Sequence, residues 1–136
     1  MTGAVSAPMG FLLVGLGGAA GAMLRYGLTL ATARAAPLFP LGTLLSNLAG
    51  CFLMGVLMAG LVRLPVSPVA DIANHPGRLL FGVGFCGAFT TLSALVVESG
   101  GLFEQGSTTL GAGYLAATLL GGFLCFFAGM LVVKLF

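Results

Sequence analysis

The chain has 136 residues, of which 59% are hydrophobic and only 6% are charged. A soluble domain carries about 25% charged residues, so this composition excludes a water-soluble surface and indicates that lipid surrounds the protein. The net charge of +2 comes from basic residues scattered singly along the chain, which excludes a patch that binds nucleic acid.

Four apolar stretches follow one another along the sequence, at residues 9–33, 41–62, 79–102 and 110–133. Each reaches the ~20 residues that a helix needs to cross a hydrocarbon core of ~30 Å. A β-barrel would need alternating strands of ~10 residues, a pattern that the sequence lacks. The connections are too short for a soluble domain. We therefore expect a single all-α transmembrane domain over residues 1–136, in the cell (inner) membrane.

The charges outside these stretches are few. Arg63, Arg78 and Lys134 fall on the side of the N-terminus, against Arg34 on the other side, to which Arg25 can be added. Positive charge tends to stay cytoplasmic, so this slight bias favours both termini inside the cell. The first ten residues carry no basic group, and no cleaved signal peptide is expected.

The first two spans each contain a polar residue. Arg25 lies about two turns from the end of the first span, at a depth where a charge faces a partner or a water-filled cavity. Alternatively, the Arg25 side chain extends along the helix and places its guanidinium at the membrane interface, an arrangement called snorkelling. Asn47 in the second span offers two donors and one acceptor, and its alternative is a plain hydrogen bond between helices.

The third span places Gly87 and the pair Thr90 and Thr91 at its centre, after further glycines at positions 82 and 84. This pattern predicts a helix broken at mid-membrane, with carbonyls freed at one half-helix end and N–H groups at the other, which suit cations and anions respectively. The alternative is an unbroken helix in which the threonines bond back to the preceding turn.

Further polar groups follow. Glu98 shares a helical face with Thr91, seven residues before it, and Tyr114 and Thr118 form a polar edge on the fourth span. Each also has an interpretation without a functional role. Glu98 and Tyr114 can be ordinary residues of the membrane interface, and Thr118 can donate to a carbonyl of its own helix.

The chemistry of these spans favours an anion pathway. They lack paired carboxylates, a Ser/His/Asp set and metal-ligand spacing, so the chain is not expected to be an enzyme. Glu98 is the only acid inside a span, which supplies a proton relay poorly. Hydrogen-bond donors solvate anions, and the spans offer several: Arg25, Asn47, Thr90, Thr91, Ser93, Tyr114 and Thr118.

Three motifs resemble those of the small microbial fluoride channels, the Fluc or CrcB family. Residues 17–26, GGAAGAMLRY, resemble the first-helix motif. Residues 40–50, PLGTLLSNLAG, resemble the second. Residues 84–91, GFCGAFTT, followed by Ser93 and Glu98, resemble the third. The motifs stand in the family's order and cover nearly the whole chain.

The resemblance implies an antiparallel, dual-topology dimer that passively exports fluoride from the cytoplasm and lowers its toxicity. The carbonyls of Gly87 and Thr90, at the break in the third helix, would hold a structural sodium ion at the dimer centre. Asn47 would donate to fluoride, and Arg25 would make the vestibule electropositive. The residues implied along the ion pathway are Arg25, Asn47, Thr91, Leu92, Ser93, Leu95, Glu98, Tyr114 and Thr118.

The chain departs from the family pattern at several pathway positions. Leu92 and Leu95 replace two phenylalanines, whose positive ring edges can face an anion. Gly122 and Phe126 lack the hydroxyls expected further along the fourth helix. These departures and the slight charge bias favour a heterodimer with a better-equipped homologous subunit over a homodimer. Two alternatives remain: a non-conducting partner subunit, and a small four-helix proton-coupled multidrug exporter.

Overall fold

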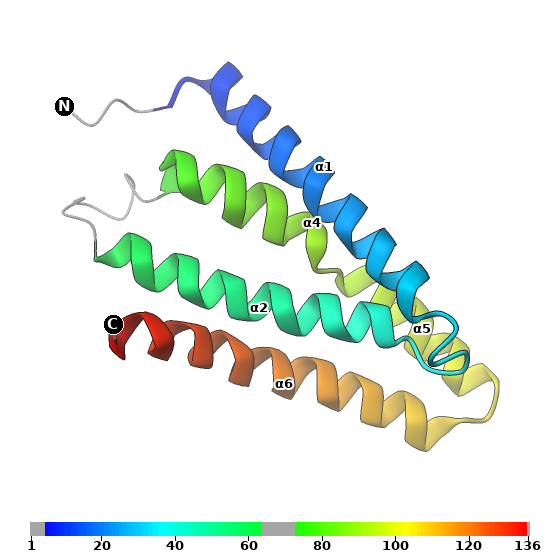
Figure 1. Cartoon of the computed structure of the whole chain (residues 1–136). Helices are drawn as coiled ribbons and strands as arrows, with labels where there is room; N and C mark the ends of the chain where they lie inside the picture. Colours follow the sequence, from blue (N-terminus) through cyan, green and yellow to red (C-terminus); the bar gives the residue numbers. More distant parts are fainter. Residues whose placement is uncertain (1–4, 64–72, 136) are drawn as a thin grey trace.

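The computed structural model describes residues 5–63 and 73–135. These residues form helices and no strands, which confirms the all-α part of the predicted fold class (Figure 1). The elements are α1 (Ala7–Thr32), α2 (Leu41–Val62), the π-helix η1 (Arg78–Cys86), α4 (Gly87–Phe89), α5 (Leu92–Glu104) and α6 (Thr108–Leu135). Most of the connection predicted between the second and third spans lies outside the described residues.

Within the described residues, four segments are long and apolar enough to cross a membrane: Ala7–Thr32, Leu41–Val62, Arg78–Glu104 and Thr108–Leu135. The third consists of η1, α4 and α5 in succession. The spans alternate in direction, so the start of α1 and the end of α6 lie at the same end of the bundle (Figure 1). Large apolar side chains such as Phe11, Met23 and Leu124 are exposed on the outside of the bundle, as lipid requires. The chain is a multi-pass membrane protein.

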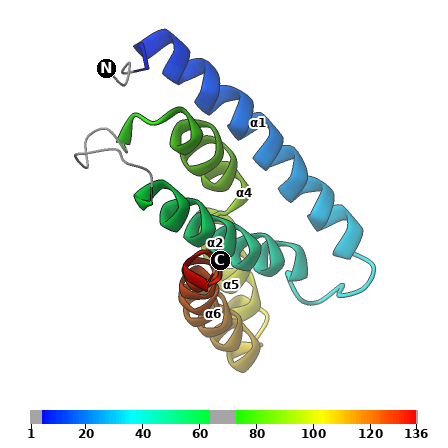
Figure 2. The same ribbon diagram turned by 60° about the vertical axis from the view of Figure 1, so that its left-hand side comes forward.

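The helices pack as two pairs, with α1 along η1 and α4, and α2 along α6 (Figure 2). Glycine permits both contacts. A Cβ at Gly17 would overlap the carbonyl oxygen of Leu80, and one at Gly55 would overlap that of Phe126. Apolar side chains gain nothing by leaving lipid for one another, so close backbone contact is a main source of stability between such helices.

A small apolar cluster joins α5 to α6 near one end of the bundle. Its buried members are Leu95, Leu102 and Tyr114, and Phe39 packs its ring against that of Tyr114 with 5.4 Å between centroids. Tyr114 is only 1% exposed. The cluster therefore fixes the Tyr114 hydroxyl relative to the third span.

We predict that Gly17→Ala lowers the thermal midpoint of the detergent-purified protein, because the new methyl group forces α1 away from η1. Overpacking of this kind costs about 1–3 kcal/mol. Gly15→Ala is the matched control, since no atom lies within 4 Å of its Cβ position. Circular dichroism during heating measures both; equal midpoints for the two variants would show that α1 and η1 are not in backbone contact.

Candidate functional site

The candidate site begins where the third span leaves helical geometry. Helix α4 ends at Phe89, Thr90 and Thr91 are extended (φ −86°, ψ 155° and φ −154°, ψ 122°), and α5 begins at Leu92. The Thr90 N–H and hydroxyl both donate to the carbonyl of Cys86, at 3.0 and 2.9 Å. The Thr91 hydroxyl accepts the Ala94 N–H at 3.2 Å. Thr91 is thus the N-cap of α5, which stabilises the start of that helix.

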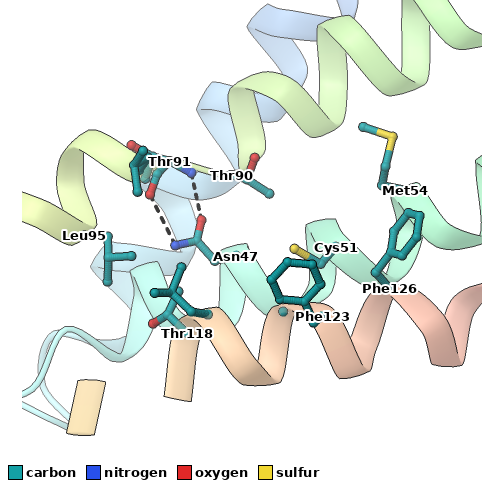
Figure 3. A pocket seen from close by; sticks show the side chains of 12 residues that line it. Asn47, Cys51, Met54, Thr90, Thr91, Leu95, Thr118, Phe123 and Phe126 are labelled. Atoms are coloured by element: carbon teal, nitrogen blue, oxygen red, sulfur yellow. Dashed lines mark hydrogen bonds between the residues drawn. The ribbon is translucent and has the colours of Figure 1, made fainter. Parts of the chain in front are cut away.

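Asn47 of α2 binds the main chain of this extended segment. Its Oδ1 accepts the Thr91 N–H at 2.7 Å, and its Nδ2 donates to the Thr91 carbonyl at 3.2 Å (Figure 3). Asn47 is only 7% exposed. The two bonds satisfy main-chain groups that would otherwise be unpaired in an apolar surrounding, where each would cost several kcal/mol.

Arg25 of α1 binds the same region from the other side. Its Nε donates to the carbonyl of Ala88, in the single turn of α4, at 3.1 Å. The carboxyl end of a helix carries partial negative charge and carbonyls without helical partners. A guanidinium there both interacts favourably with the helix dipole and donates a hydrogen bond to a free carbonyl. Arg25 therefore lies half-buried against the third span.

A second polar group surrounds Glu98 of α5. Its two carboxylate oxygens accept hydrogen bonds from the hydroxyls of Thr43 and Tyr114, each at 2.7 Å. Thr118 donates to the carbonyl of Tyr114 at 2.8 Å. These bonds join α2, α5 and α6 at one level of the bundle.

A cavity of about 470 Å³ opens between α2, the extended segment and α6 (Figure 3). Four polar residues line it, namely Asn47, Thr90, Thr91 and Thr118. The remaining lining residues are apolar or contain sulfur: Cys51, Met54, Leu92, Leu95, Leu119, Gly122, Phe123 and Phe126. The polar residues of the lining thus gather at the extended segment and the facing part of α6, and the remainder is apolar.

The structure brings some of the predicted residues together and leaves others apart. Five of the predicted pathway residues line the cavity: Asn47, Thr91, Leu92, Leu95 and Thr118. Thr90, which was predicted as a sodium ligand, lines it as well. Five lie outside this lining: Arg25, Gly87, Ser93, Glu98 and Tyr114. Of these, Ser93 is exposed and its hydroxyl shares a 3.1 Å hydrogen bond with that of Thr91.

Sequence reasoning missed two groups of residues on α2. Cys51 and Met54 follow Asn47 at helical spacing and line the cavity, and Thr43 precedes it by one turn and binds Glu98. The spacings i−4, i+4 and i+7 from Asn47 carry the signal, because residues at these positions share one face of a helix.

The comparisons with known proteins show the family to which the chain belongs. A family model described as CrcB-like protein, Camphor Resistance (CrcB), matches residues 12–130, which include every residue of the site. The chain belongs to this CrcB family. The resemblance found in the three sequence motifs is confirmed.

Three relatives resemble the chain over most of its length. Proteins named "Fluoride-specific ion channel FluC" from Chlorobaculum tepidum and Gloeobacter violaceus are 41% and 43% identical to it, over 91% and 90% of this chain and 94% of each relative. A Geobacillus kaustophilus protein named "Fluoride-specific ion channel FluC 1" is 48% identical over 82% of this chain and 86% of the relative.

We predict that Thr91→Val lowers the thermal midpoint, because valine keeps the shape of threonine but cannot accept the Ala94 N–H. Loss of an N-cap costs about 1 kcal/mol. Thr29→Val is the control, since the Thr29 hydroxyl only bonds back to the carbonyl of Arg25 within an intact helix. Heating curves of the two variants that coincide would contradict the capping role.

Proposed function

We propose that the chain is a subunit of a fluoride-selective channel through which fluoride leaves the cell passively. The cavity beside the interrupted span carries the proposal. The polar residues of its lining are one asparagine and three threonines, and no Asp or Glu of the described residues belongs to it. Donor groups stabilise an anion, whereas a carboxylate would repel it. The identity of the anion as fluoride is taken from the names of the relatives, each of which states fluoride specificity.

The hydroxyls of the threonines beside the cavity can turn to solvate a small, strongly hydrated anion. The Thr90 hydroxyl donates to the Cys86 carbonyl, which also accepts the Thr90 N–H. Because that carbonyl keeps its N–H partner, the hydroxyl can rotate toward an ion without leaving a buried acceptor unpaired. Thr118 bonds to its own helix in the same i to i−4 manner. The walls can therefore exchange internal bonds for bonds to fluoride at little net cost.

The position of Glu98 disfavours the alternative of a proton-coupled exporter. Such a protein needs an acid facing its substrate cavity. Both carboxylate oxygens of Glu98 accept hydrogen bonds from hydroxyl groups, and the residue does not belong to the described lining of the cavity. Its geometry suits a fixed structural acceptor that holds α2 and α6 against α5.

The proposal includes an antiparallel dimer with a sodium ion held by the carbonyls of Gly87 and Thr90. The main chain at the end of α4 fits such an ion. Since the Thr91 N–H donates to Asn47, the Gly87 carbonyl loses its usual helical donor. Among the described residues no cluster of His, Cys, Asp or Glu offers a competing metal site. Oxygen ligands suit a hard cation, which would bring positive charge to the interface between the two subunits.

A heterodimer is the second candidate, because part of the cavity lacks polar groups. Gly122 and Phe126 of α6 line it without hydroxyls, beside Met54 and Phe123. Leu92 also lines it and is 68% exposed in the single chain. A neighbouring subunit that contributes aromatic edges and hydroxyls would complete a route that this chain leaves apolar.

Fluoride efflux from liposomes tests both candidates. The purified chain is reconstituted alone or with a co-expressed homologous subunit, and released fluoride is followed with a selective electrode, with and without sodium. Efflux from the chain alone supports the homodimer, and efflux only in the mixture supports the heterodimer. Efflux in neither preparation would overturn the proposed function, and efflux unaffected by sodium would overturn the sodium site.

We predict that Leu92→Phe increases fluoride efflux, because the exposed position has room for a ring whose positive edge faces the cavity. Leu95→Phe is the comparison. Leu95 also lines the cavity but is only 2% exposed within the α5–α6 cluster, so a larger ring there costs about 1–3 kcal/mol of stability. Efflux rates are normalised to folded protein. An unchanged rate for Leu92→Phe would remove the aromatic edge from the account of conduction.

A further inference from the structure

The orientation of the Asn47 amide is fixed by the groups that it meets. The Thr91 N–H can only donate and the Thr91 carbonyl can only accept, so Oδ1 must face the first and Nδ2 the second. If the amide were turned over, its N–H would face the Thr91 N–H and its oxygen would face the Thr91 carbonyl oxygen. The main chain thus selects one of the two orientations of a side chain that is otherwise nearly symmetric in shape.

This pairing requires the extended conformation of Thr91. In an extended residue the N–H and the carbonyl project to the same side, as they do between paired strands. In an α-helix the two groups point in opposite directions along the axis, and one amide could not bind both. The interruption of the third span and the orientation of Asn47 therefore depend on each other.

The pairing determines what Asn47 can present to the cavity. Oδ1 and the N–H on the same edge of the amide are bound to Thr91, so one N–H of Nδ2 remains (Figure 3). The hydrogen bonds found for this side chain among the described residues are the two to Thr91. The acceptor oxygen, which would repel an anion, is turned to the main chain, and a donor is left over.

We propose that the main chain of Thr91 acts as an orientation key for Asn47, so that an anion in the cavity meets an N–H and never the amide oxygen. Thr91 is then a specificity-determining residue through its backbone, and Asn47 both positions the interruption and contacts the ion. This inference rests on the proposed function, since it assigns the chemical basis for choosing an anion at the same site.

Asn47→Asp tests the remaining N–H without removing the pairing. A neutral aspartic acid can accept the Thr91 N–H and donate to the Thr91 carbonyl, but it has no further donor. The protein should stay folded, with a thermal midpoint close to that of the wild type, and fluoride efflux should fall to background. Asn74→Asp makes the same chemical change outside the spans and should conduct normally. A folded Asn47→Asp protein with wild-type efflux would overturn the inference.

A spectroscopic arm separates this inference from the proposed function. The sequence contains two asparagines, Asn47 and Asn74, so ¹⁵N-asparagine labelling in an Asn74→Asp background leaves one side-chain amide to observe in lipid. We expect one slowly exchanging proton, bound to Thr91, and a second that shifts when sodium fluoride replaces sodium chloride. If both protons exchange rapidly or neither shifts, the orientation key is wrong, whatever the efflux assay shows. If these signals are as expected but the wild type shows no efflux, the proposed conduction fails instead.

Discussion

The two hydrogen bonds between the Asn47 amide and the Thr91 main chain are the interaction on which the rest of the site depends. A span in lipid has no water to bond the main-chain groups that an interruption exposes. Asn47 satisfies a donor and an acceptor together, while Arg25 binds the Ala88 carbonyl just before the extended residues. The segment is held by neighbouring helices, α2 on one side and α1 on the other. Their hydrogen bonds offset the free-energy cost of a non-helical stretch in an apolar bundle.

Holding this segment in place also creates the chemistry of the cavity. The same bonds that stabilise Thr91 turn the amide oxygen of Asn47 away and leave one N–H. They also free the Gly87 carbonyl from its usual helical donor, since the Thr91 N–H is engaged elsewhere. The proposed donor for anions and the proposed oxygen ligand for a cation would therefore both arise from one local departure from helical geometry, as expected at the facing ends of two half-helices.

The sequence was sufficient to predict the four spans, because composition and length alone decide whether a segment can lie in lipid. It also singled out Asn47 and Thr91 as polar groups in apolar surroundings. Their pairing was not predicted, since they are 44 residues apart and meet only when α2 packs beside the third span. Leu119 and Phe123 of the cavity lining gave no signal, because they are ordinary residues for a span. The π-helical geometry of η1 was likewise not predicted, since glycines at 82 and 84 suit several backbones.

The most direct test of the account is a high-resolution experimental structure of the chain in a lipid bilayer with sodium and fluoride. The account predicts Thr90 and Thr91 extended, both Thr91 main-chain groups within hydrogen-bond distance of the Asn47 amide, and anion density on the cavity side of Nδ2. A helix that continues from η1 through residues 87–92, with Asn47 turned away from Thr91, would contradict it.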